Sequence, residues 1–64
     1  MNIGGNLKRL REEKSLTQEG LAKRVGISQT MVAQVERGSK TLTLPTADAV
    51  CKALGCTLYD LLEG

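Results

Sequence analysis

The sequence predicts an all-α fold, a compact bundle of five short helices, from three observations. Aromatic residues are almost absent, with Tyr59 alone, so Leu, Ile, Val, Ala and Met must form the core, and that mixture suits helices better than sheets. Apolar residues recur every three or four positions. Serines and threonines precede these runs as helix N-caps, and glycines follow them as stops. At 64 residues, we expect a single domain over residues 1–64 with a thin core.

The first, fourth and fifth helices are expected at about Ile3 to Lys14, Leu44 to Leu54 and Leu58 to Leu62. Gly4 and Gly5 weaken the first turn of the first helix, because glycine is a poor helix former. The inner stripe of the fourth helix is expected to comprise Leu44, Ala47, Val50, Cys51 and Leu54.

The second and third helices have the pattern of a helix-turn-helix, over about residues 17–38. Thr17 caps the second helix, Gly26 allows a sharp turn, and Ser28 caps the third helix. Ala22 is small where two helices must cross closely. Three apolar residues are expected to seal the corner and continue the buried stripe: Ile27, Val32 and Val35.

Charge is unevenly placed along the chain. Residues 1–40 carry eight Lys/Arg and four Asp/Glu, a net charge of +4, whereas residues 41–64 carry a net charge of −2. A basic front suits a protein that presents one end to a polyanion, and a randomly charged solvated surface is an equal alternative on charge alone.

Several functional classes are disfavoured by what the chain lacks. It has no His, and Cys51 and Cys56 are not spaced as C-x-x-C, so we expect no metal site, no cofactor and buried reduced thiols. The chain has no paired carboxylates and no glycine-rich phosphate loop, so an enzyme is disfavoured. It also has no aromatic platform on which bases could stack, so RNA binding is disfavoured. No apolar run has the length of a membrane span and polar residues begin at Asn6, so we expect a cytoplasmic protein without a signal peptide.

Three runs follow one another over about Asn6 to Leu62: LKRLREEKSLTQEGLAKRVGIS, QVERG and KALGCTLYDLL. In these runs, their order and their spacing, the chain resembles the Cro and phage-repressor family of helix-turn-helix regulators. The resemblance implies that the third helix, at about residues 28–37, lies in the major groove with its N-terminal end on base edges.

By position, Gln29, Thr30 and Gln34 correspond to the family's base-reading residues. A glutamine amide donates and accepts together, which matches N6 and N7 of adenine. Gln34 also fits a solvated polar position. Met31 is a further candidate, because an exposed thioether can touch a thymine methyl group, and a core position is equally consistent.

Gln18 corresponds to a family position that hydrogen-bonds a DNA phosphate, helped by the amides and dipole of the helix end. Further phosphate candidates lie beside it or after the third helix: Thr17, Arg37, Ser39, Lys40 and Thr41. Lys40 alone is equally consistent with a solvated lysine, so the cluster is the evidence. Such contacts position a protein on DNA without reading the sequence.

Arg11 and Glu36 match a family pair that forms a structural salt bridge between the first and third helices. Two residues depart from the family pattern. Gly20 stands where a better helix former is usual, at a cost of about 1 kcal/mol, and Leu42 stands where a proline often precedes the fourth helix. Neither lies on the expected reading surface, so both bear on stability.

A dimer is expected because one recognition helix spans too few base pairs to single out a genomic site. The resemblance places the contact on the last helix, at Leu58, Tyr59 and Leu62. Leu58, Leu61 and Leu62 cannot all point inward from so short a helix, and the patch is small, so the homodimer should be weak in free solution. In the alternative, the leucines cap the core and the protein binds as a monomer.

The leading hypothesis is a sequence-specific double-stranded DNA-binding transcriptional regulator, a repressor on a palindromic operator. The alternative is a protein-interaction module of the antitoxin or anti-repressor type, which in some cases also binds DNA. That alternative predicts a large exposed apolar patch.

Overall fold

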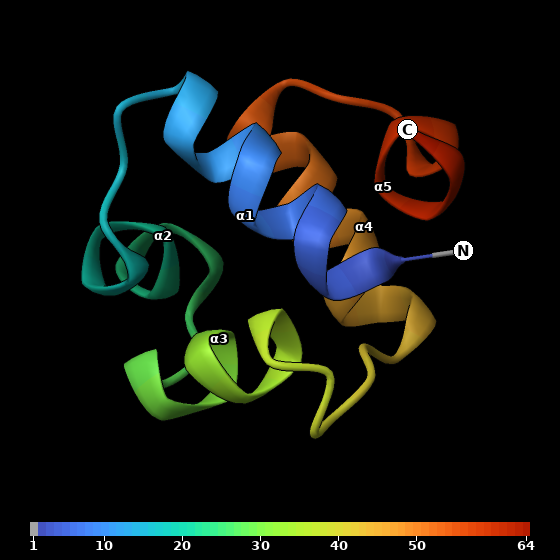
Figure 1. Ribbon diagram of the computed structural model, residues 1–64. Helices are drawn as coiled ribbons and strands as arrows, with labels where there is room; N and C mark the ends of the chain where they lie inside the picture. The colour runs from blue at the N-terminus through green and yellow to red at the C-terminus, as the bar shows by residue number, and fades with distance from the viewer. Residues whose placement is uncertain (1) are drawn as a thin grey trace.

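The computed structural model describes residues 2–64, and this part of the chain folds into five α-helices joined by short connections (Figure 1). The helices are α1 (Ile3–Glu13), α2 (Gln18–Val25), α3 (Gln29–Glu36), α4 (Leu44–Leu54) and α5 (Leu58–Glu63). The predicted all-α class is confirmed, and the ends of α1 and α5 differ from expectation by one residue.

Side-chain caps and a left-handed glycine fix the corner between α2 and α3. Thr17 Oγ1 accepts from the backbone N–H of Gly20 at 2.9 Å, and Ser28 Oγ accepts from that of Met31 at 3.0 Å. Gly26 ends α2 with a φ of 86°, a conformation that costs other residues about 1 kcal/mol. The chain therefore turns sharply between the two helices without a longer linker.

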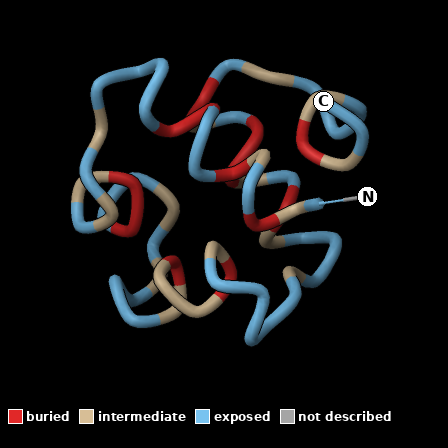
Figure 2. The backbone as a smooth tube through the Cα atoms, in the orientation of Figure 1, coloured by how far each residue is buried: buried red, intermediate tan, exposed pale blue. Residues whose placement is uncertain are grey.

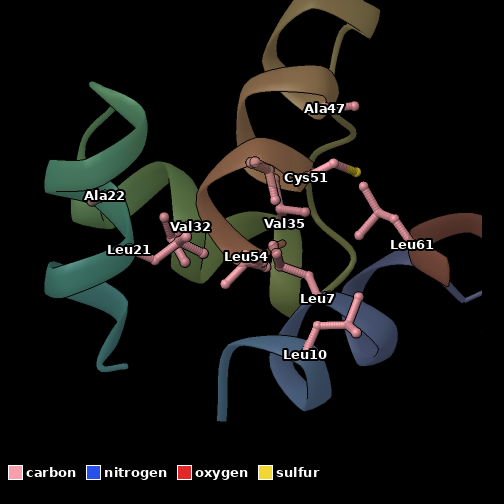
Figure 3. Close-up of a cluster of buried hydrophobic side chains, with 11 residues drawn as sticks. Leu7, Leu10, Leu21, Ala22, Val32, Val35, Ala47, Cys51, Leu54 and Leu61 are labelled. Atoms are coloured by element: carbon pink, nitrogen blue, oxygen red, sulfur yellow. The ribbon is translucent and has the colours of Figure 1, made fainter. Parts of the chain in front are cut away.

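All five helices contribute to one hydrophobic core, and most of its side chains are drawn in Figure 3. α1 packs against α3 and α5, and α2 packs against α3 and α4. Figure 2 shows the buried residues on the inner turns and the exposed ones on the outer turns and connections. The core residues are Leu7, Leu10, Leu21, Ala22, Val32, Val35, Ala47, Val50, Cys51, Leu54 and Leu61.

The expected inner stripe of α4 is wrong at one position. Leu44 is 75% exposed, whereas the other four residues of the stripe are buried. Leu44 is the first residue of α4, which begins at the periphery of the molecule after a loop (Figure 1). The apolar spacing therefore continues beyond the part of the helix that its neighbours cover.

Gly4 has a packing role that its low helix propensity does not suggest. It is buried in the first turn of α1, against the last turn of α3. A Cβ atom at this position would lie 2.5 Å from the carbonyl oxygen of Val35 and 2.7 Å from that of Glu36. The missing side chain therefore allows α1 and α3 to approach closely, which alanine would prevent.

Candidate nucleic-acid interface

The first turn of α3 presents two polar side chains to solvent. Gln29 and Thr30 follow the cap Ser28 and are both exposed. On the opposite face of the helix, Val32 and Val35 are each 1% exposed and lie in the core. α3 is therefore anchored along one face while its N-terminal end carries an amide and a hydroxyl group on the open side.

Met31 and Gln34, the other two expected base-reading residues, are half-buried. Met31 packs against the hydrophobic core, which agrees with the core-filling alternative, and part of its side chain stays accessible. Gln34 lies four residues after Thr30, so the two share a face of α3. The polar side chains of α3 thus continue beyond its first turn.

The segment after α3 folds back onto the end of that helix. Gly38 takes a φ of 82°, and the backbone N–H groups of Ser39 and Lys40 donate to the carbonyl oxygen of Gln34 at 2.9 and 3.3 Å. The expected phosphate-contacting residues of this segment are all exposed: Arg37, Ser39, Lys40 and Thr41. Their polar groups therefore emerge beside the C-terminal end of α3.

At the start of α2, Thr17 is exposed and Gln18 is half-buried. The amide of Gln18 is engaged inside the protein, because its Nε2 donates to Oε1 of Glu36 at 3.1 Å. Sequence analysis missed this contact, since the two residues are 18 positions apart and only the packing of α2 on α3 brings them together.

Glu36 is also bound by Arg11, so side chains from three helices meet. Arg11 Nε donates to Oε2 of Glu36 at 2.7 Å, and Nη2 donates to Oε1 at 3.1 Å. Arg11 Nη1 donates to the carbonyl oxygen of Leu16 at 2.6 Å. The Arg11 and Glu36 side chains are only 9% and 5% exposed. The hydrogen bond to Glu36 raises the pKa of Arg11 above its ordinary value, so the guanidinium stays charged.

α5 carries the apolar residues expected at a dimer contact. Tyr59 is 72% exposed, Leu58 is 38% exposed and Leu62 is half-buried. Leu61, by contrast, lies fully in the core. One leucine of this short helix therefore enters the core, and two stay at least partly accessible.

Metal-binding groups, pockets and membrane-spanning helices are absent from residues 2–64. No three His, Cys, Asp or Glu side chains in this range are grouped to hold a metal ion, and the same residues enclose no pocket. Within this range, too, every helix is too short or too polar to cross a bilayer. Cys51 and Cys56 are free thiols, and burial raises the pKa of Cys51 to about 11.

Comparison with known proteins finds the same arrangement of helices elsewhere. A helix-turn-helix family model matches residues 7–61. The uncharacterised HTH-type transcriptional regulator y4dJ of Sinorhizobium fredii is 40% identical over 60 residues, which are 94% of this chain and 78% of that protein.

Two solved structures are similar over nearly their whole length. The restriction-modification controller protein C.AhdI from Aeromonas hydrophila has a TM-score of 0.91 and 33% identity, covering 95% of this chain and 92% of that one. The P22 c2 repressor in complex with a synthetic operator has a TM-score of 0.92 and 30% identity, covering 100% of this chain and 97% of that one. The predicted bundle of the phage-repressor type is confirmed by these fits.

Proposed function

The chain belongs to the helix-turn-helix family, and we propose that it is a sequence-specific double-stranded DNA-binding transcriptional regulator that acts as a repressor. The observation that carries this proposal is the first turn of α3, where exposed Gln29 and Thr30 stand on a helix fixed by buried valines. A helix presented in this way fits the major groove, which is about 12 Å wide. The similarity to a repressor crystallised in complex with a synthetic operator supports the proposal.

Direct base reading is assigned to the polar face of α3. The Gln29 amide can bind adenine through two hydrogen bonds at once. Its nitrogen donates to N7 of the base, and its oxygen accepts from the N6 amino group. Thr30 and Gln34 extend this hydrogen-bonding face along the groove, and the accessible part of Met31 is suited to a thymine methyl group.

Phosphate contacts are assigned to both ends of the motif. Thr17 and Gln18 lie at the start of α2, where the positive end of the helix dipole favours an anion. Arg37 and Lys40 supply cationic groups after α3, and the exposed residues Ser39 and Thr41 supply hydroxyl groups. These contacts fix the orientation of α3 on the duplex and add sequence-independent affinity.

Two copies are proposed to bind one palindromic operator through α5. Among residues 2–64, the exposed large apolar side chains are Leu44, Leu58 and Tyr59, all in the last two helices. Leu58, Tyr59 and half-buried Leu62 form the proposed contact. A six-residue helix offers little area, so the dimer is weak in free solution and is strengthened on DNA. Sedimentation of the protein with a two-half-site duplex should give two chains per duplex, and one chain at saturation would contradict the dimer.

The salt dependence of binding tests the proposed function. Affinity for duplexes from upstream of the chain's own gene, and for random duplexes, is measured over a series of salt concentrations. A plot of the logarithm of the binding constant against the logarithm of the salt concentration should have a slope of about −0.9 for each phosphate contact. Lys40→Ala removes one such contact, so its slope should be shallower by about 0.9. Lys52→Ala is the control, because Lys52 lies on α4 and pairs with Asp48 at 3.1 Å. Binding that does not respond to salt would contradict the proposal.

A further inference from the structure

The amide of Gln18 is tied to the ion pair between α1 and α3. Its Nε2 donates to Oε1 of Glu36 at 3.1 Å, and the same oxygen accepts from Nη2 of Arg11 at 3.1 Å. The other carboxylate oxygen, Oε2, accepts from Nε of Arg11 at 2.7 Å. Both oxygens of Glu36 are therefore bonded, and one of them connects Gln18 to Arg11.

Burial fixes the orientation of this network. The Glu36 side chain is 5% exposed, and the Arg11 side chain, at 9%, is also held by the carbonyl oxygen of Leu16 at 2.6 Å. A two-bond contact between a guanidinium and a carboxylate sets orientation as well as distance, and it is stronger away from water. Glu36 is therefore able to hold the amide of Gln18 in one orientation.

Gln18 retains donors for a ligand. An amide nitrogen carries two hydrogens, and Glu36 accepts one of them. The backbone N–H groups of Gln18 and Glu19 find no acceptor among residues 2–64, because they precede the first intrahelical hydrogen bond of α2. The start of α2 thus offers a fixed amide donor next to unpaired backbone donors.

We propose that Glu36, oriented by Arg11, is a positioning residue for DNA binding, because it fixes the amide of Gln18 in the orientation that donates to a phosphate. This inference rests on the proposed function. Glu36 and Arg11 are buried, so Gln18 is the side chain through which this pair would reach a phosphate. Holding the amide in advance removes the side-chain entropy that a mobile glutamine would lose on binding.

The first test compares the effect of Gln18→Ala in two backgrounds. One background is the natural chain, and the other is Arg11→Met with Glu36→Leu, which replaces the ion pair by apolar side chains of similar size, a change that proteins often tolerate. Affinity for a random-sequence duplex is measured at fixed salt, with circular dichroism showing that each variant is folded. Gln18→Ala should lower affinity about tenfold in the natural chain, the magnitude of a hydrogen bond to a charged group.

In the apolar background, Gln18→Ala should change affinity by less than about twofold, because the amide is no longer held before binding. Lys40→Ala is the matched control, since Lys40 is exposed and lies outside the network, and it should cost the same in both backgrounds. An equal loss from Gln18→Ala in both backgrounds would overturn the inference and leave Arg11 and Glu36 with a structural role alone.

A second measurement needs no variant to fold. Nitrogen-15 relaxation of the glutamine side chains in the free natural chain should show a rigid Gln18 amide beside a mobile one at exposed Gln29. A Gln18 amide as mobile as that of Gln29 would overturn the inference. Failure of the proposed function is recognised separately, because the natural chain would then bind no duplex at low salt and Lys40→Ala would have no effect.

Discussion

Arg11 and Glu36 join α1 to α3 through two hydrogen bonds, at 2.7 and 3.1 Å, between side chains that are 9% and 5% exposed. Little water can replace either partner, so removing one leaves the other charge buried and unpaired. Glu36→Ala is expected to lower the free energy of unfolding by about 3–5 kcal/mol, measured by urea denaturation.

The control for this prediction is the exposed pair of Arg9 and Glu13, whose side chains are 44% and 58% exposed. Glu13→Ala should lower the free energy of unfolding by less than about 0.5 kcal/mol, because water screens such a pair. An unchanged urea midpoint for Glu36→Ala would show that the Arg11–Glu36 pair does not hold the two helices together.

Gly4 and Gly20 should respond oppositely to alanine. At Gly4 a Cβ atom would lie 2.5 Å from the carbonyl oxygen of Val35, and backbone atoms cannot move aside as a side chain can, so Gly4→Ala should destabilise the fold by about 1–3 kcal/mol. At Gly20 the nearest atom would be Thr17 Oγ1 at 3.2 Å, so the gain in helix propensity should dominate and stabilise the fold by up to about 1 kcal/mol. Thermal unfolding measures both, and a stabilising Gly4→Ala would contradict the close approach of α1 and α3.

The capping box of α5 should make stability depend on acid pH. Thr57 N–H donates to Oδ2 of Asp60 at 3.0 Å, and this backbone hydrogen bond is the main cause that lowers the pKa of Asp60. A carboxylate of this kind stabilises the fold above its unfolded pKa, about 3.9, and loses that contribution as the pH falls through its lower folded pKa. Urea midpoints should therefore fall less steeply below about pH 4 in Asp60→Asn than in the natural chain. Parallel curves for the two proteins would count against this account.

The two cysteines should differ in reactivity. Burial raises the pKa of the Cys51 thiol to about 11, and Cys51 is 5% exposed. Only the thiolate reacts with iodoacetamide, so at pH 8 the half-buried Cys56 should be alkylated well before Cys51. The raised pKa also means that stability declines as the pH rises from about 8.5 towards 11. Mass spectrometry follows the alkylation of both thiols. If Cys51 and Cys56 of the folded protein were alkylated at the same rate, as they should be in urea, the burial of Cys51 would be contradicted.

Helix boundaries were predictable because they depend on neighbours in the sequence. Thr17, Ser28 and Thr57 cap helices through hydrogen bonds to residues three positions later, and Gly26 and Gly55 take left-handed conformations after α2 and α4. The left-handed Ser15, with a φ of 57°, carries no such signal. It lies in the α1–α2 connection, where the backbone N–H groups of Ser15 and Leu16 donate to the carbonyl oxygens of Glu12 and Arg11 at 2.9 and 3.1 Å.

Contacts between distant residues were not predictable from spacing alone. The resemblance to a known family supplied the pairing of Arg11 with Glu36, but not the hydrogen bond from Gln18 to the same carboxylate. Gly4 looked like a weak point in a helix, because its neighbours Val35 and Glu36 are known only after folding. Leu44 matched the apolar period of α4, although periodicity cannot tell where the covering helices end.

Selection of bound duplexes from a randomised library tests directly whether α3 reads a DNA sequence. The natural chain should enrich one inverted repeat with half-sites about one helical turn apart. Gln29→Ala should lose roughly 1–3 kcal/mol on that site, relax the preference at one base pair of each half-site, and keep its affinity for random DNA. No enrichment by the natural chain, or equal losses by Gln29→Ala on the selected site and on random DNA, would contradict base reading by α3.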